Sequence, residues 1–169
     1  MSTRPASGDG PVLICYDGSK HAAHALEFAA ALLSGAEALV VTAWTPILQA
    51  VMAVTLGPAP PISDPVDADA RQRQTAEEFA RNGARRATQA GLRAEPLTVR
   101  ASGRVWEAIE KVARERRARL VVCGTRRSGT MSAVVDSVPG ALLHRATRPV
   151  LAVPSPDAVA ERVRESADE

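Results

Sequence analysis

The segment 120–154 places a glycine-bearing loop and a helix-like stretch between two short apolar runs. The first run ends at Cys123, the loop contains Gly124 and Gly129, and the second run fills residues 149–153. Glycines let the backbone approach an anion closely, and the free N–H groups at the start of a helix attract negative charge. This order of elements predicts a phosphate-binding β-α-β unit.

The same layout begins near the amino terminus. Residues 12–16 have the pattern of a buried strand that ends just before Asp17, and a Gly-Ser-Lys sequence then leads into a helix-like segment. Asp17 and Gly124 therefore both follow predicted strands. In open parallel sheets, ligands bind outside the carboxyl ends of the strands, near the point where the strand order reverses. If their strands are neighbours, these two residues face one crevice.

Strand-like and helix-like segments alternate along most of the chain. Strands are predicted at residues 12–16, 38–44, 92–99, 119–123 and 149–153, and helices at residues 19–33, 67–89, 105–117 and 131–146. Consecutive Val, Leu and Ile residues in the strands indicate burial on both faces, and the intervening helices indicate right-handed crossovers between parallel strands. The sequence predicts an α/β fold with one open, five-stranded, Rossmann-like parallel sheet and helices on both of its faces.

One domain is expected to occupy residues 11–154. Residues 1–10 lack the apolar core of a signal peptide and are predicted to be a disordered lead-in. Residues 155–169 are predicted to be a C-terminal tail that could hold a short amphipathic helix. Residues 45–67 are apolar but interrupted by prolines, which predicts a loop.

Composition argues against several classes of protein. The net charge is +2 and aromatic residues make up 3% of the chain, so the basic excess and stacking surfaces of nucleic-acid-binding proteins are missing. No apolar run approaches the ~20 residues that cross a membrane. Cys15 and Cys123 fall in strands predicted to be neighbours and are expected to be buried, reduced thiols, with a disulfide or redox sensor as the alternative. These features indicate a cytoplasmic protein with no nucleic-acid or membrane partner.

Three stretches of the chain resemble the universal stress protein family, which has the fold of the adenine-nucleotide α-hydrolase-like class. They are VLICYDGSKHAAHALEFA from residue 12, GRVWEAIEKVARERRARLVVCGTRRSG from residue 103 and SVPGALLHRATRPVLAVP from residue 137. The resemblance covers nearly all of residues 12–154. It implies strand order 3-2-1-4-5 and a stress-response regulator that is not an enzyme. It also implies a homodimer paired through an exposed apolar edge strand that runs from Pro149 to Val153.

The chain keeps only part of the glycine motif of the ATP-binding family members. That motif resembles Gly, two residues, Gly, nine residues, Gly, then Ser or Thr. Gly124 matches its first glycine and Ser137 its final hydroxyl, whereas Arg127 and Asp136 stand at the other two glycine positions, and the loop is one residue shorter. Gly129 matches a further glycine that is common in this loop.

The departures from the motif have opposite electrostatic effects. A carboxylate at Asp136 would repel a phosphate by roughly 4 kcal/mol, for charges ~4 Å apart at an effective dielectric constant of ~20. Arg126 and Arg127 favour phosphate, because guanidinium groups match its geometry. The sequence therefore leaves two functions open. One is a regulator that binds an adenine nucleotide between the strands at residues 12–16 and 119–123, and the other is a nucleotide-independent dimeric interaction module with a vestigial cleft.

The resemblance implies a site with adenine and ribose near Asp17 and Ala43, and phosphates over the loop and the following helix. The expected ligand-binding residues are Asp17, Ala43, Gly124, Thr125, Arg126, Arg127, Gly129, Ser137 and Val138. The expected ligand is ATP, with Mg²⁺, or another adenine nucleotide, and the sequence identifies no protein partner.

Two of these site residues also have a purely structural interpretation. The histidines show no pattern that is typical of catalysis or metal binding. Asp17 could cap the helix at residues 19–33, and Ser137 could bond back within the helix at residues 131–146. No histidine stands at a metal-ligand spacing, and His21 is expected on the surface. No catalytic residues or protein metal site are therefore predicted.

Overall fold

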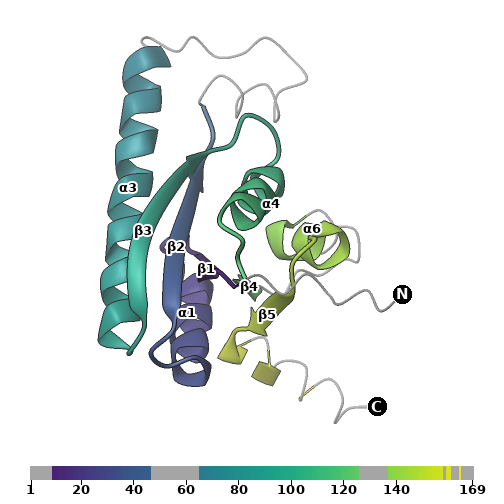
Figure 1. The fold of residues 1–169 in the computed structure, drawn as a ribbon. Helices are drawn as coiled ribbons and strands as arrows, with labels where there is room; N and C mark the ends of the chain where they lie inside the picture. The colour runs from purple at the N-terminus through teal and green to yellow at the C-terminus, as the bar shows by residue number, and fades with distance from the viewer. Residues whose placement is uncertain (1–8, 47–64, 126–136, 158, 161–163, 165–169) are drawn as a thin grey trace.

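A computed structural model describes residues 9–46, 65–125, 137–157, 159–160 and 164 (Figure 1). Its elements, in chain order, are β1 (Val12–Cys15), α1 (Lys20–Leu32), β2 (Glu37–Trp44), α3 (Pro65–Gln89), β3 (Arg93–Arg100), α4 (Val105–Glu115), β4 (Leu120–Thr125), α6 (Val138–Arg145) and β5 (Val150–Pro154). Most of the predicted loop at residues 45–67, and the start of the helix predicted at residues 131–146, lie outside the described residues.

The strands form one sheet in the order β3-β2-β1-β4-β5, and every neighbouring pair is parallel. The predicted α/β fold and strand order 3-2-1-4-5 are confirmed. β1 lies between β2 and β4, so the chain moves outward in opposite directions from this central strand. A crevice is expected at the carboxyl ends of β1 and β4, where the strand order reverses.

Helices cover both faces of the sheet (Figure 1). Val12 and Ile14 of β1 join a core that α1 and α3 cover, whereas Leu13 packs on the opposite face beneath α4 and α6. All three residues are completely buried. Successive side chains of a strand point to opposite faces, which explains why the strands read as continuous apolar runs. Within the described part of the chain, none of the helices combines the length and the apolar character needed to cross a bilayer.

A buried carboxylate fixes the connection between α6 and β5. Glu110 on α4 is 8% exposed. Its Oε1 accepts a hydrogen bond from the Thr147 N–H at 3.2 Å and another from the Thr147 hydroxyl at 2.5 Å. Hydrogen bonds to a charged acceptor are stronger than those between neutral groups. The contact therefore holds the turn before β5 against α4.

Replacement of Glu110 by alanine is expected to lower the free energy of unfolding by about 1–3 kcal/mol, because both hydrogen bonds to Thr147 are lost. Glu107→Ala is the matched control, since Glu107 lies one turn earlier on α4 and is exposed. Urea unfolding followed by circular dichroism measures both variants. Equal stability of the two variants would show that the Glu110 contact contributes nothing.

Candidate functional site

A cavity of about 490 Å³ opens at the carboxyl ends of β1, β2 and β4 and at the amino end of α6. Its volume lies in the range of small-molecule sites, roughly 300–1,000 Å³. Buried apolar side chains, including Val41 of β2 and Ile109 of α4, form part of its wall.

This cavity brings together the sequence-predicted site residues that the structure describes. They are Asp17, Ala43, Gly124, Thr125, Ser137 and Val138. Arg126, Arg127 and Gly129 lie outside the described residues.

Hydrogen bonds beyond the end of β1 position Asp17 at the cavity. The Tyr16 N–H donates to the Val41 carbonyl oxygen at 2.9 Å, and the Thr42 hydroxyl donates to the Tyr16 carbonyl oxygen at 2.7 Å. These bonds continue the contact between β1 and β2 by one residue. The exposed Asp17 follows directly, and its Oδ1 accepts a hydrogen bond from the Ser19 N–H at 3.0 Å.

Ser19, and not Asp17, is the N-cap of α1. The Ser19 hydroxyl accepts a hydrogen bond from the Ala22 N–H at 3.2 Å. Gly18, between these two polar residues, has φ +78°, a conformation that disfavours a Cβ, and an added Cβ would lie 2.9 Å from the Phe79 ring. The alternative in which Asp17 caps the helix is therefore wrong, because Asp17 stabilises the turn that precedes the cap.

Ser137 is the N-cap of α6 and does not lie inside a helix. Its hydroxyl oxygen accepts a hydrogen bond from the Gly140 N–H at 3.1 Å, and the preceding turn to which the alternative bond would run lies outside the described residues. Pro139 has no N–H. The Gly140 N–H is bonded to the Ser137 hydroxyl. Among the first three residues of α6, the Val138 N–H is therefore the donor that can face a ligand. The Ser137 O–H can donate while its oxygen accepts.

Gly124 has a packing role in addition to its position in the motif. A Cβ added at this residue would lie 2.4 Å from the carbonyl oxygen of His21 and 3.0 Å from the backbone nitrogen of Ala22. Only glycine lets the end of β4 approach the first turn of α1 so closely. This close approach joins the two halves of the cavity.

His21 is the cavity residue that contradicts its sequence-based prediction. It is partly buried and lines the cavity, whereas a surface position was expected. In the described structure its Nδ1 atom is buried and has no hydrogen-bond partner. Val41 of β2 and Ile109 of α4 also escaped sequence analysis, because only the topology brings them to this edge of the sheet.

Two free thiols lie at the floor of the cavity. Cys123 is buried, and Cys15 is partly buried. Burial raises the pKa of the Cys15 thiol well above its usual range, and the nearby Cys123 and Asp17 raise it further. Burial also raises the pKa of the Cys123 thiol to about 11. Both side chains are therefore neutral at pH 7.

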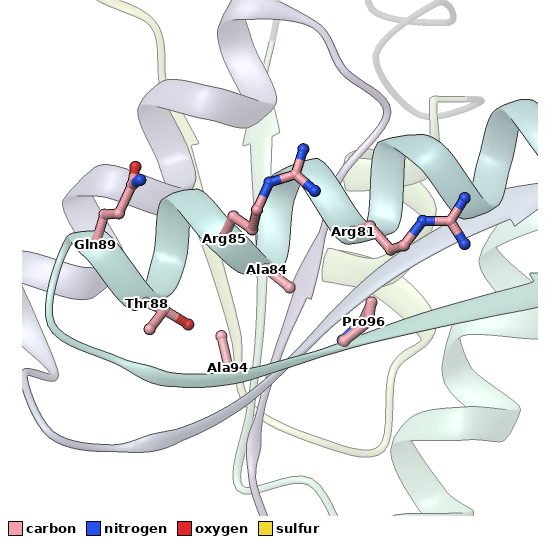
Figure 2. A pocket seen from close by; sticks show the side chains of 7 residues that line it. All are labelled: Arg81, Ala84, Arg85, Thr88, Gln89, Ala94 and Pro96. Atoms are coloured by element: carbon pink, nitrogen blue, oxygen red, sulfur yellow. The ribbon is translucent and has the colours of Figure 1, made fainter.

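A second hollow lies between α3 and β3, at the opposite edge of the sheet from β5 (Figure 2). Figure 2 shows that the Arg81 and Arg85 side chains lead away from the space between Ala84, Ala94 and Pro96. Ala84, Ala94 and Pro96 give this hollow an apolar floor, and Thr88 and Gln89 also line it. The cavity at the strand ends combines apolar walls with polar groups at both ends, which is the usual composition of a small-molecule site. Among the described residues, no group of three His, Cys, Asp or Glu side chains could hold a metal ion.

Comparisons with known proteins agree on one family. Residues 10–154 match the family model described as "Universal stress protein family". A structure of a universal stress protein family member from Burkholderia pseudomallei has 28% identity and a TM-score of 0.59, and the alignment covers 85% of this chain and 95% of that one. A search of curated proteins found no match.

Two further structural neighbours contain nucleotides. A universal stress protein in complex with cAMP has 24% identity and a TM-score of 0.59, over 84% of this chain and 94% of that one. The universal stress protein from Archaeoglobus fulgidus in complex with dAMP has 22% identity and a TM-score of 0.57, over 85% and 97%. At these identities, the two neighbours establish the fold alone.

Gly124→Ala is expected to destabilise the protein by about 1–3 kcal/mol, the usual cost of overpacking, because the new Cβ meets backbone atoms of α1. Gly103→Ala is the control, since its Cβ would meet only the flexible end of the Glu107 side chain. Thermal unfolding of both variants provides the measurement. A Gly124 variant as stable as the Gly103 variant would contradict the proposed packing role.

Proposed function

We propose, since the chain belongs to the universal stress protein family, that this stress-response protein binds an adenine nucleotide in the cavity between β1 and β4. One observation carries the proposal: the described candidate residues, widely separated in the sequence, line a single cavity of suitable size. The complexes of two structural neighbours with cAMP and dAMP support the same ligand class.

The two ends of the cavity suit different parts of such a ligand. At the end of β1, the Asp17 carboxylate can accept a hydrogen bond from a ribose hydroxyl or an adenine amino group, beside the apolar Val41 and Ala43. At the other end, the Ser137 O–H and the Val138 N–H can donate to a phosphate at the positive end of α6. The nucleoside thus lies over β1 and β2, and the phosphate over β4 and α6.

The described donors suit a nucleotide with a single phosphate best. Pro139 removes one of the first-turn N–H donors of α6, and the Gly140 N–H is bonded to Ser137. ATP with Mg²⁺ is the larger candidate of the same class, and its outer phosphates would depend on residues 126–136. The proposed function is binding, and no catalytic step is assigned to the polar groups of the cavity.

Calorimetry with AMP and adenosine tests this assignment. Asp17→Ala is expected to weaken binding of both ligands by about tenfold, the loss of one hydrogen bond to a charged group. Ser137→Ala is expected to weaken AMP by a similar factor and to leave adenosine unchanged, because Ser137 contacts the phosphate alone.

Two matched variants separate ligand contacts from folding effects. Ser137→Thr keeps both the helix cap and the hydroxyl, so it should restore AMP binding. Ser34→Ala removes an exposed serine that does not line the cavity and should change nothing. If the wild-type protein binds no adenine nucleotide at millimolar concentration, the proposal fails.

We also propose that the protein forms a homodimer through β5, whose outer edge faces away from β4. Val150, Leu151 and Ala152 are partly exposed along this edge strand, and exposed apolar edge strands tend to pair. Val153 does not belong to the exposed apolar surface predicted from the sequence. It is 4% exposed and packs into the core beside α1.

Leu151→Asp is expected to convert the dimer into a monomer, because pairing would bury the charge against its symmetry mate. Leu32→Asp is the control, since Leu32 is 62% exposed on a helix. Sedimentation at micromolar concentration measures both variants. A monomeric wild-type protein would refute the dimer. A dimer that binds no adenine nucleotide would favour a nucleotide-independent interaction module.

A further inference from the structure

Cys15 and Cys123 are cross-strand neighbours at the floor of the cavity. β1 and β4 are parallel, with Leu13 opposite Val121 and Ile14 opposite Val122. The next step of this register places Cys15 opposite Cys123. Leu13 and Val121 both pack beneath α4 and α6. Because side chains two residues apart in a strand share a face, both thiols lie on this same side of the sheet.

The spacing of this pair suits a covalent bond between the sulfur atoms. Neighbouring strands lie ~4.8 Å apart, and disulfides join residues whose Cα atoms are about 4.4–6.8 Å apart. Both residues line the same cavity, and both are free thiols. Their proximity also has an electrostatic effect, because Cys123 contributes to the raised pKa of Cys15 after the larger effect of burial.

We propose that Cys15 and Cys123 are a redox modification site, which a peroxide converts into a disulfide between β1 and β4. The Cys15 thiolate attacks one peroxide oxygen and becomes a sulfenic acid, and the other oxygen leaves as water. The Cys123 sulfur then attacks the Cys15 sulfur and expels the sulfenic oxygen as a second water. In sum, two thiols and one hydrogen peroxide give one disulfide and two waters. The peroxide is reduced, and the two sulfur atoms are oxidised.

The order of the two steps follows from access and side-chain contacts. Cys15 is more exposed than Cys123, which is 2% exposed, so Cys15 meets the peroxide first. The Cys123 thiol makes a weak contact with the Leu151 carbonyl oxygen at 3.9 Å. A change of χ1 rotamer exchanges this contact for the Cys15 sulfur. Because both pKa values are raised, little thiolate is present near neutral pH, and the reaction requires sustained peroxide.

The disulfide would act on the cavity itself. Asp17 lies two residues after Cys15, and Gly124 directly follows Cys123. A bond between the sulfur atoms would fix the distance between these two strand ends and fill part of the floor. The resulting effect on ligand binding, a loss of affinity for AMP, rests on the proposed function.

Peptide mapping of the whole chain without reductant tests the modification. After exposure of the folded protein to hydrogen peroxide, the intact mass should fall by two hydrogen atoms, and one cross-linked peptide pair should contain Cys15 and Cys123. Dithiothreitol should reverse both changes. The chain has only two cysteines, so the assignment is unambiguous. A wild-type protein that forms only sulfinic or sulfonic acids, or only intermolecular disulfides, would overturn the proposal.

Single variants separate the pair from ordinary thiol oxidation. In Cys123→Ser, the Cys15 sulfenic acid should persist long enough for dimedone to trap it, whereas wild type should give little adduct. Cys123→Ala serves the same purpose if the serine variant does not fold. Equal trapping in wild type and variant would show that Cys123 does not resolve the sulfenic acid, which overturns the proposal.

Calorimetry with AMP on reduced and oxidised protein tests the effect on the cavity. The oxidised protein should bind AMP at least several-fold more weakly, and equal affinities would refute the regulatory effect alone. If the reduced protein binds no AMP, the proposed function fails, and peptide mapping still decides whether the disulfide forms.

Discussion

The burial of β1 on both faces, between two parallel neighbours, is the constraint on which the rest of the structure depends. Its apolar residues pack under α1 and α3 on one side and under α4 and α6 on the other. Its backbone pairs with β2 along one edge and with β4 along the other, so β1 occupies the middle of the sheet. The chain builds outward from β1 through β2 to β3 on one side, and then crosses to β4 and β5 on the other. This divergence opens a cavity where β1 and β4 end.

Close backbone contacts define the shape of that cavity. Gly124 lets the end of β4 contact the first turn of α1, and Gly18 turns with positive φ under the Phe79 ring. At both places a Cβ would clash with its surroundings. These glycines therefore serve the packing of the strand ends whether or not a ligand is bound. A glycine motif in such a loop is consequently weaker evidence for nucleotide binding than the assembled cavity.

The polar groups around the cavity combine structural and ligand-binding capacity. Ser137 and Ser19 both cap helices, and the carboxylate of Asp17 holds the turn before α1. A capping hydroxyl can still donate its proton, so structural use does not prevent recognition of a ligand. The thiols of Cys15 and Cys123 differ, because they form no cap or turn. The packing of the fold alone does not require two thiols at the floor of the cavity.

Local sequence patterns determined the order of the elements, the two-sided burial of the strands and the family resemblance. Alternating faces and helix periodicity are short-range properties, and a motif such as that at Gly124 can be read directly. Only the tertiary structure decided that His21 lines the cavity and that Val153 is buried. It also decided that Val41 and Ile109 form a wall of the site. Each of these depends on contacts between segments far apart in the chain, and strand order and register, not local preference, set those contacts.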